Sequence, residues 1–469
     1  MLHGRFADWL EAVAGDRMVE NEEILGYHLE QAHDYRHGLG QRHDRVTELA
    51  RRSGAWLAAA GDRAEQRQDI RAAQGLLTRA VRLLPAGHAR YWPAHLKLAS
   101  VLVDAGDLGA ASDLYLSIAE DPEDVPDELR VEARLVHAWV ETDRGRLSSA
   151  GTRRAIGEAL CAATRGNHHR IASRAWFLAA GLYQNSLDVP RAERALKRAA
   201  RHADLADDPD GELDTLLALA GLGSRSLMPV SEAMAFLDRA LAIPGLSRAQ
   251  RGRVEESRAY LLGLQGRFDE ARDLMAEEVR ELTELGRLEG LSAVSTTFGL
   301  IEFFAERYTA AREHFVVSRD LSDQSGRAEW SRFMAGRLAH IYMLEGDDEA
   351  ALANVEIVKR SHVEGGDIEW WGELFASGAE ARILARRGQT AEAVERARGM
   401  VAVAEDRGFT NYPVVFAPAL EDLAEVLAAD GQTQEACQVL NRAITIHRAK
   451  ENAAGLAKAE RALARIGGE

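Results

Sequence analysis

His33 and His37 are the two side chains of this sequence whose type and spacing come nearest to a metal site. They stand four residues apart in a segment of helical periodicity, so a helix would bring both imidazoles to one face. No cysteine lies near them, and the surrounding sequence offers no recognisable third ligand. The alternative is a polar face near an interface, and on that interpretation we expect no metal and no other cofactor.

The motifs of the common catalytic sites are missing from the sequence. None of the five lysines follows a glycine, which excludes the phosphate-binding loop Gly-x-x-x-x-Gly-Lys-Ser/Thr. The sequence also lacks His-Glu-x-x-His, Gly-x-Ser-x-Gly and Cys-x-x-Cys. We therefore expect a binding module and not an enzyme. The enzymatic alternative is an unrecognised site around Glu256 or His340, which would need a perturbed pKa in a deep pocket.

Two pairs of adjacent aromatic residues, Phe303-Phe304 and Trp370-Trp371, could contribute to a binding surface. Neighbouring side chains on a helix point about 100° apart. One member of each pair is therefore expected to pack between helices, and the other is free to face a partner. Aromatic residues dominate both protein cores and binding hot spots, so both interpretations stay open.

The elements that carry these residues belong to a repeat of about forty residues. An alanine recurs after each predicted turn at intervals of 38 to 43 residues, and a glycine or alanine stands seven residues before each turn. The turn alanines are Ala73, Ala111, Ala150, Ala192, Ala233, Ala271, Ala311, Ala351, Ala393 and Ala436. The second small residues are Gly61, Ala99, Ala138, Ala180, Gly221, Ala259, Gly299, Ala339, Ala381 and Ala424.

Small residues on both sides of a tight turn allow two antiparallel helices to pack at a short distance. Repetition of this pattern predicts an all-α fold, an α-solenoid of about ten antiparallel helix pairs. The length of 469 residues exceeds what one compact core usually supports, which also favours a linear array.

The repeats divide the chain into three expected parts. Residues 1–44 form a helical linker segment, residues 45–451 the helical repeat array, and residues 452–469 a capping helix with a wet outer face, followed by a tail. Cys161 and Cys437 lie far apart along the array, so we expect them to be small buried residues that do not form a disulfide with each other.

The net charge of −16 and the isoelectric point near 5.5 argue against a surface that binds nucleic acid. The basic stretch 191–201 is followed by acidic residues and is best explained as a solvated helix face. No signal peptide and no apolar run of membrane-spanning length is found, so we expect a cytoplasmic location and no membrane partner.

The stretch LAHIYMLEGDDEAALANV, residues 338–355, resembles the tetratricopeptide repeat. The matching positions are Leu338, Ala339, Tyr342, Gly346, Asp347, Ala351 and Val355. The long period is more similar to the variant found in the maltose-regulon activator and related signal-transduction ATPases of the STAND class. HGRFADWLEAVAG and EEILGYHLEQAHDYR, residues 3–15 and 22–36, are similar to the segment that joins ATPase and winged-helix domains to helical repeats in large bacterial regulators, including nucleotide cyclases.

This resemblance implies a right-handed superhelix whose inner wall is built from the first helix of each pair. The family's groove positions, transferred to this sequence, give the predicted binding residues. These are Leu135, Trp139, Arg174, Phe177, Gln184, Arg225, Arg253, Glu256, Tyr260, Thr296, Phe303, Phe333, His340 and Arg382. Their mixture of aromatic and arginine side chains is typical of binding hot spots.

The leading hypothesis is that the groove recognises a protein, a peptide or a small effector. The resemblance implies that the chain would be the sensor half of a signal-transduction regulator, encoded alone or as part of a longer protein. One alternative is a standalone scaffold that joins two proteins without responding to a signal. The ligand, the oligomeric state and the meaning of Met1 as a start are left open by the sequence.

Overall fold

The computed structural model describes residues 2–15, 18–41, 44–67, 69–121, 125–144, 146–284, 288–324, 327–360 and 367–468. The chain divides into two compact units. Unit 1 comprises residues 1–179, 198–211 and 245–250. Unit 2 comprises residues 180–197, 212–244 and 251–469.

All regular secondary structure in the described residues is helical. The first eleven α-helices are α1 (Leu2–Ala14), α2 (Met18–Gly38), α3 (Asp44–Gln66), α4 (Ile70–Leu83), α5 (Tyr91–Asp104), α6 (Leu108–Glu120), α7 (Asp127–Asp143), α8 (Ser149–Gly166), α9 (His169–Asn185), α10 (Val189–Leu205) and α11 (Pro209–Arg225). The next are α12 (Val230–Leu241), α13 (Arg248–Leu264), α14 (Phe268–Glu284), α15 (Leu288–Phe304), α16 (Tyr308–Gln324), α17 (Ala328–Glu345) and α18 (Asp348–Arg360). The last are α19 (Asp367–Arg386), α20 (Thr390–Asp406), α21 (Pro413–Ala429), α22 (Thr433–Lys450) and α23 (Ala453–Gly467), with a 3₁₀ turn η2 (Phe409–Asn411) before α21.

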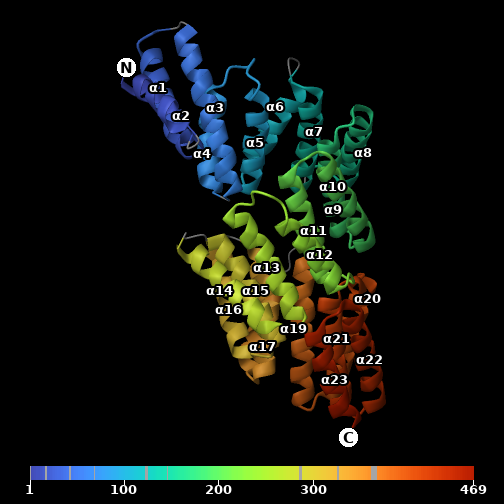
Figure 1. Ribbon diagram of the computed structural model, residues 1–469. Coiled ribbons are helices and arrows are strands. Elements are labelled where there is room, and N and C mark those ends of the chain that lie inside the picture. The colour runs from blue at the N-terminus through green and yellow to red at the C-terminus, as the bar shows by residue number, and fades with distance from the viewer. Residues whose placement is uncertain are drawn as a thin grey trace. The chain divides into compact units, whose positions relative to one another are not determined.

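The helices from α3 to α22 form ten consecutive pairs, which confirms the predicted all-α helical-repeat fold. Within unit 2, α17 packs against its own partner α18 and also against the next first helix, α19 (Figure 1). Helix α19 in turn packs against both α20 and α21. The first helices therefore lie against one another along the unit, and the second helices cover them.

Seven of the described turns inside the pairs place one residue in the left-handed backbone region, and the turn between α11 and α12 does not. Gly346 ends α17 with φ 87°, and its N–H bonds to the carbonyl of Met343. Glu306 occupies the same place after α15 with φ 58°, although it has a side chain. Glycine is therefore frequent at the turn but not required, because a single residue with a side chain can adopt this conformation at a cost of about 1–2 kcal/mol.

The turn alanines are buried at nine of the ten predicted positions. Ala150 is the exception because it is exposed on α8. In that pair the turn is longer, and the fully buried residue four places after the N-cap Ser148 is Thr152. The turn positions Gln68 and Gly145, which helped to define the repeat, lie outside the described residues.

The second small residue is misplaced in one pair. A side chain at Gly221 would meet nothing within 4 Å, whereas one at Gly223 would overlap Met228 and Ala233. Gly223 therefore makes the close approach of α11 to α12, two residues after the predicted position. The repeat period does not distinguish Gly223 from Gly221, because both residues are glycines in the same helix.

Helices α17 and α19 of unit 2 cross in backbone contact. A Cβ atom at Gly336 would overlap the backbone carbonyl group of Gly372, so the two helices touch backbone to backbone at this point. Arg337 follows Gly336 and Trp371 precedes Gly372, so both residues lie next to this backbone contact in the sequence.

Two further expectations concern the cysteines and membranes. Cys161 is exposed on α8, so the expectation of a buried side chain is wrong there, while Cys437 is half-buried and both are free thiols. In the part of the chain that the structure describes, no helix combines the length and the apolar character needed to cross a bilayer.

The α17–α19 crossing predicts a large difference between two glycine substitutions. Gly336→Ala should lower the free energy of unfolding by about 3 kcal/mol, since the added methyl group overlaps a backbone carbonyl that has no freedom to rotate away. Gly399→Ala is the matched control, because Gly399 lies in α20 with no atom within 4 Å of the added Cβ. That change should stabilise by about 0.5–1 kcal/mol. Urea unfolding followed by circular dichroism would measure both; equal effects would contradict the crossing.

Candidate functional site

The predicted binding residues of unit 1 lie on α7 and α9. Leu135 is buried with 1% exposure, which is a core position and not a groove position. Trp139, Arg174 and Phe177 are half-buried. They are therefore the unit 1 residues from the predicted set that keep some surface.

In unit 2, five of the predicted residues are half-buried and Arg253 is exposed. Arg253 donates to Asp214, a surface ion pair. The half-buried residues are Gln184, Arg225, Glu256, Tyr260 and Arg382.

The other four predicted residues of unit 2 are buried, so the expectation of an open groove is not met at their positions. Thr296 contacts its own pair, because its hydroxyl bonds to that of Ser318 on α16. Phe303, Phe333 and His340 are between 2% and 8% exposed. For Phe303 and His340 the physical reason is that C-terminal helices lie against them, as described below.

A group of hydrogen-bond donors, which we call the donor cluster, lies on α11, α13, α17 and α19. It consists of Arg225, Tyr260, Arg337 and Trp371. The Arg225 guanidinium carbon lies 5.9 Å from the Trp371 ring centroid. Tyr260 interacts electrostatically with both Arg337 and Arg225. Donors from four of the first helices of unit 2 thus lie in one region.

Three phenylalanine rings surround the guanidinium of Arg337. Its central carbon lies 3.8 Å from the centroid of Phe375, 5.5 Å from that of Phe333 and 5.7 Å from that of Phe303. Phe333 also contacts Trp371, with 6.3 Å between the ring centroids. Arg337 is therefore linked to Trp371 through one shared ring, and the donor cluster is continuous.

The charge of Arg337 has no counter-charge among the residues that the structure describes. Arg337 is 5% exposed, its Nε atom has no hydrogen-bond partner, and no described carboxylate forms an ion pair with it. Burial lowers the pKa of Arg337 to about 10, against a smaller opposing effect of Tyr260. Burial also raises the pKa of Tyr260 to about 12. Removing a cation from water without a paired anion is costly, so this arrangement needs an explanation.

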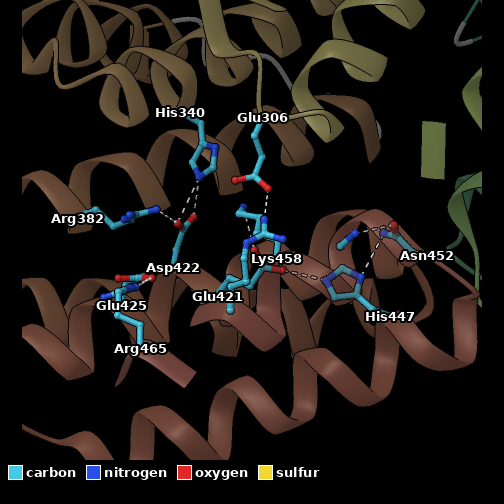
Figure 2. Close-up of polar contacts among 12 residues, drawn as sticks. Glu306, His340, Arg382, Glu421, Asp422, Glu425, His447, Asn452, Lys458 and Arg465 are labelled. Carbon is cyan, nitrogen blue, oxygen red and sulfur yellow. Dashed lines mark hydrogen bonds and ion pairs between the residues drawn. The ribbon is translucent and has the colours of Figure 1, made fainter. Parts of the chain in front are cut away.

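A second polar group in unit 2, the C-terminal network, ties α21 to the first helices. His340 on α17 donates from Nε2 to Asp422 on α21 at 3.1 Å, and Arg382 on α19 donates to the same carboxylate at 3.3 Å (Figure 2). Burial alone would raise the pKa of Asp422, but His340 and Arg382 outweigh that effect and hold the pKa at about 2. Asp422 is thus a buried carboxylate with two partners.

Glu421, beside Asp422, extends the C-terminal network toward α22 and α23. It bonds to His447 at 2.8 Å and to Lys458 at 3.0 Å (Figure 2). Burial would raise the pKa of Glu421, but Lys458 and His447 hold it at about 2. Burial likewise would lower the pKa of Lys458, and Glu421 with its neighbours raises it instead.

Helix α23 therefore does more than cap the array with a wet face. Lys458 lies 5.8 Å from the ring centroid of Phe303, and Arg461 forms an ion pair with Glu306 at the end of α15. Arg465 pairs with Glu425 on α21. Arg461 and Arg465 stay mostly exposed to solvent while they join α23 to Glu306 and to α21, and Lys458 reaches the buried Glu421.

Several members of these two groups were missed by the sequence reasoning. Arg337 stands inside the apolar run FMAGRLAHIYML, and Asp422 inside PALEDLAEVL. A charged residue on the apolar stripe of a helix is the signal that could have identified them. Of the adjacent aromatic pairs, Phe303 is buried and Phe304 half-buried, while the Trp370 side chain lies outside the described residues.

The histidine pair of unit 1 makes polar and ring contacts. The rings of His33 and His37 stack with 5.7 Å between centroids, and His33 bonds to Asp34. Among the side chains that the structure describes, no three histidine, cysteine or carboxylate groups are arranged to hold a metal ion.

No protein-family model matches the sequence, and no curated protein matches it either. Solved structures match the fold. The chain is similar to a Rap protein solved in complex with Competence and Sporulation Factor, with 14% identity, a TM-score of 0.54, and coverage of 81% of this chain and 98% of that one. It is also similar to the apo form of RapI, with 11% identity, a TM-score of 0.50, and coverage of 80% and 98%. At these identities the likeness establishes a shared helical-repeat fold of the tetratricopeptide kind.

The depressed pKa of Asp422 predicts an acid-dependent loss of stability. Its ordinary pKa is 3.8 and its folded pKa about 2, so its stabilisation is complete above the ordinary value and disappears as the pH falls through the folded one. Asp422→Asn should lower the free energy of unfolding at pH 7 by about 2 kcal/mol, and the difference from wild type should shrink between about pH 4 and pH 2.

The control for this prediction is Glu425→Gln on the same helix. Glu425 pairs with the exposed Arg465, so its loss should change stability by less than about 1 kcal/mol. Urea midpoints measured across the pH range would test both variants. A constant difference between wild type and Asp422→Asn down to pH 2 would show that the carboxylate does not titrate as described.

Proposed function

We propose that this chain is a non-catalytic binding module that recognises a peptide or a segment of a protein partner, and that it serves as the sensor half of a signal-transduction regulator. The observation that carries the proposal is the donor cluster, which brings Arg225, Tyr260, Arg337 and Trp371 together from four first helices of unit 2. Arginine, tyrosine and tryptophan are the residues most enriched at binding hot spots.

The half-buried members of the donor cluster supply its accessible side. Arg225 and Tyr260 keep part of their surface, while Arg337 and Trp371 are buried. Arg225 donates from Nε to the carbonyl group of Gly221 on its own helix, and this bond fixes the position of its side chain. Its other N–H groups form no ion pair with a carboxylate among the described residues. A partner that supplies hydrogen-bond acceptors would satisfy these donors.

The comparisons support this proposal at the level of the fold. One similar structure is a Rap protein in complex with a factor, so a helical-repeat chain of this kind accommodates a bound partner. The regulatory role rests on the resemblance of residues 3–36 to the segment that precedes helical repeats in bacterial regulators. A scaffold without signal response remains the alternative.

The residues named for the enzymatic alternative have structural partners. Glu256 accepts a hydrogen bond from Thr297 on α15 at 3.0 Å, and burial raises its pKa. His340 is 2% exposed and bound to Asp422. Glu256 and the Nε2 atom of His340 thus have structural partners, and binding is the function that the geometry supports best.

A peptide-display selection against the full chain tests the proposal. Peptides selected by the wild type should bind the double variant Arg225→Ala/Tyr260→Ala more weakly, on the order of tenfold or more, because two hot-spot side chains are removed from the accessible side of the donor cluster. Fluorescence polarisation with labelled peptides would give the affinities. Circular dichroism would verify that the variant remains helical.

The matched control is Arg253→Ala. Arg253 lies on the same helix as Tyr260 but is exposed and paired with Asp214, so its loss should leave the affinity within about twofold. Unchanged binding by the double variant would move the binding surface away from the donor cluster. Failure to select any peptide would contradict the proposed peptide recognition.

Binding that also alters the C-terminal network would separate a sensor from a scaffold. A sensor needs two states, and α21 to α23 are joined to the first helices by titratable ion pairs that a ligand could rearrange. Hydrogen exchange in α21–α23 should therefore change when a selected peptide is bound. Exchange confined to the contacted residues would favour the scaffold.

A further inference from the structure

We infer that the donor cluster binds a carboxylate carried on an apolar body, with the carboxylate on Arg337 and the apolar body against Phe303, Phe333 and Phe375. This inference rests on the proposed function and specifies the chemistry of its ligand. The observation behind it is the combination of a buried guanidinium without a partner and a set of neighbours that donate hydrogen bonds.

The first argument is the unbalanced charge. In the same unit, the buried Asp422 and Glu421 each have at least two cationic or hydrogen-bonding partners, and the buried Lys450 donates to two backbone carbonyl groups. Arg337 is the buried ion in this region for which the described residues provide neither an acceptor for Nε nor a carboxylate. An anion supplied from outside the chain would complete it.

The second argument is the uniform polarity of the neighbours. Trp371 Nε1 is a buried donor without a partner, and Arg225 has only donors on its guanidinium. The hydroxyl of Tyr260 is protonated at neutral pH like that of any tyrosine, and burial raises its pKa further, to about 12. Glu256 is the nearest acid along α13, one turn before Tyr260, and it is engaged by Thr297. His340 also lies beside this region, 6.0 Å from Phe303 and 5.9 Å from Phe375 between ring centroids, and its Nδ1 has no partner. The four members of the donor cluster are donors, and converging donors favour an anionic ligand.

The third argument distinguishes carboxylate from phosphate. The Arg337 guanidinium carbon lies 3.8 Å from the centroid of the Phe375 ring, so the ring packs against the guanidinium face, and a ligand would have to meet its edge. A planar carboxylate accepts two parallel hydrogen bonds from such an edge. The remaining oxygens and the second charge of a phosphate would lie against phenylalanine rings, where no donor offsets their loss of water.

The test uses 3-phenylpropanoate as the probe and 3-phenylpropanamide as its neutral match. The carboxylate should raise the Tm of the wild-type chain in a concentration-dependent way and quench tryptophan fluorescence, and the amide should do neither. Inorganic phosphate at the same concentration should have no comparable effect. Equal responses to the acid and the amide, no response to either, or an equal response to phosphate would each overturn the inference.

Arg337→Met is the decisive variant. Its affinity for 3-phenylpropanoate should fall on the order of a hundredfold, while its Tm without ligand should equal or exceed that of the wild type, because an unpaired buried cation has been removed. Arg386→Met is the control: Arg386 lies on α19 and pairs with the surface residue Asp348, so ligand binding should persist. A variant Arg337→Met that keeps its preference for the acid would overturn the inference.

Arg337→Lys covers the case in which Arg337→Met does not fold. Lysine keeps the charge but lacks the planar edge, so the preference for acid over amide should remain with an affinity about tenfold lower. Wild-type affinity in Arg337→Lys would refute the two-bond geometry.

Selected peptides separate this inference from the proposed function. The same peptide is prepared with free carboxyl groups and with those groups converted to amides. If both forms bind equally, peptide recognition stands and the carboxylate site is refuted. If no peptide binds but 3-phenylpropanoate does, the site stands for a small molecule and the proposed peptide recognition is refuted.

Discussion

The backbone contact between α17 and α19 at Gly336 and Gly372 is the constraint on which the rest of unit 2 depends. Helices that touch without intervening side chains have little freedom to slide or rotate, since any shift would produce a clash or a void. Arg337 and Trp371 are the immediate neighbours of these glycines. Their positions therefore follow from the packing of the helices, and they do not rely on flexible loops.

Unit 2 treats its buried charges in two different ways. Asp422 is held by His340 and Arg382, and this satisfied group joins α21 to α17 and α19. Arg337 lies one helical turn before His340 on the same helix and faces aromatic rings instead of a carboxylate. Natural proteins retain such unfavourable groups mainly where function requires them. On the same helix, His340 pairs with Asp422 and maintains the fold, whereas Arg337 has no paired anion and is the group that we propose for the ligand.

The repeat made most of the fold predictable, because it depends on short-range features. A buried alanine four residues after a cap and a small residue on the preceding helix can be recognised within one pair, as at Ala351 and Ala339. The errors arose where a local detail changed the spacing: the longer turn before Thr152, and the choice of Gly223 over Gly221. Neither of these two local details changes the average period of about forty residues.

The candidate site was only partly predictable. Tyr260 and Arg225 were found from the offsets of the resembled family, and they lie where a partner could reach them. The burial of Phe303 and His340 was not foreseen, since it arises from contacts with Lys458 and Asp422, which are distant in sequence. Periodicity reports the face on which a residue lies, but it carries no information about which later helix returns to cover that face.

Lys450 gives unit 2 a property that simple helical repeats lack. At the end of α22 it is fully buried and donates to the carbonyl groups of Gly223 and Met228, and the adjacent Glu451 accepts hydrogen bonds from Ser231 at 2.8 and 3.0 Å. In an array with contacts only between neighbours, the terminal pair can unravel first, and stability is a sum of local terms. Here α22 bonds back to α11 and to the turn that follows it, so a ribosome must release more than two hundred residues before this junction can close. Unit 2 should consequently unfold as a single cooperative block.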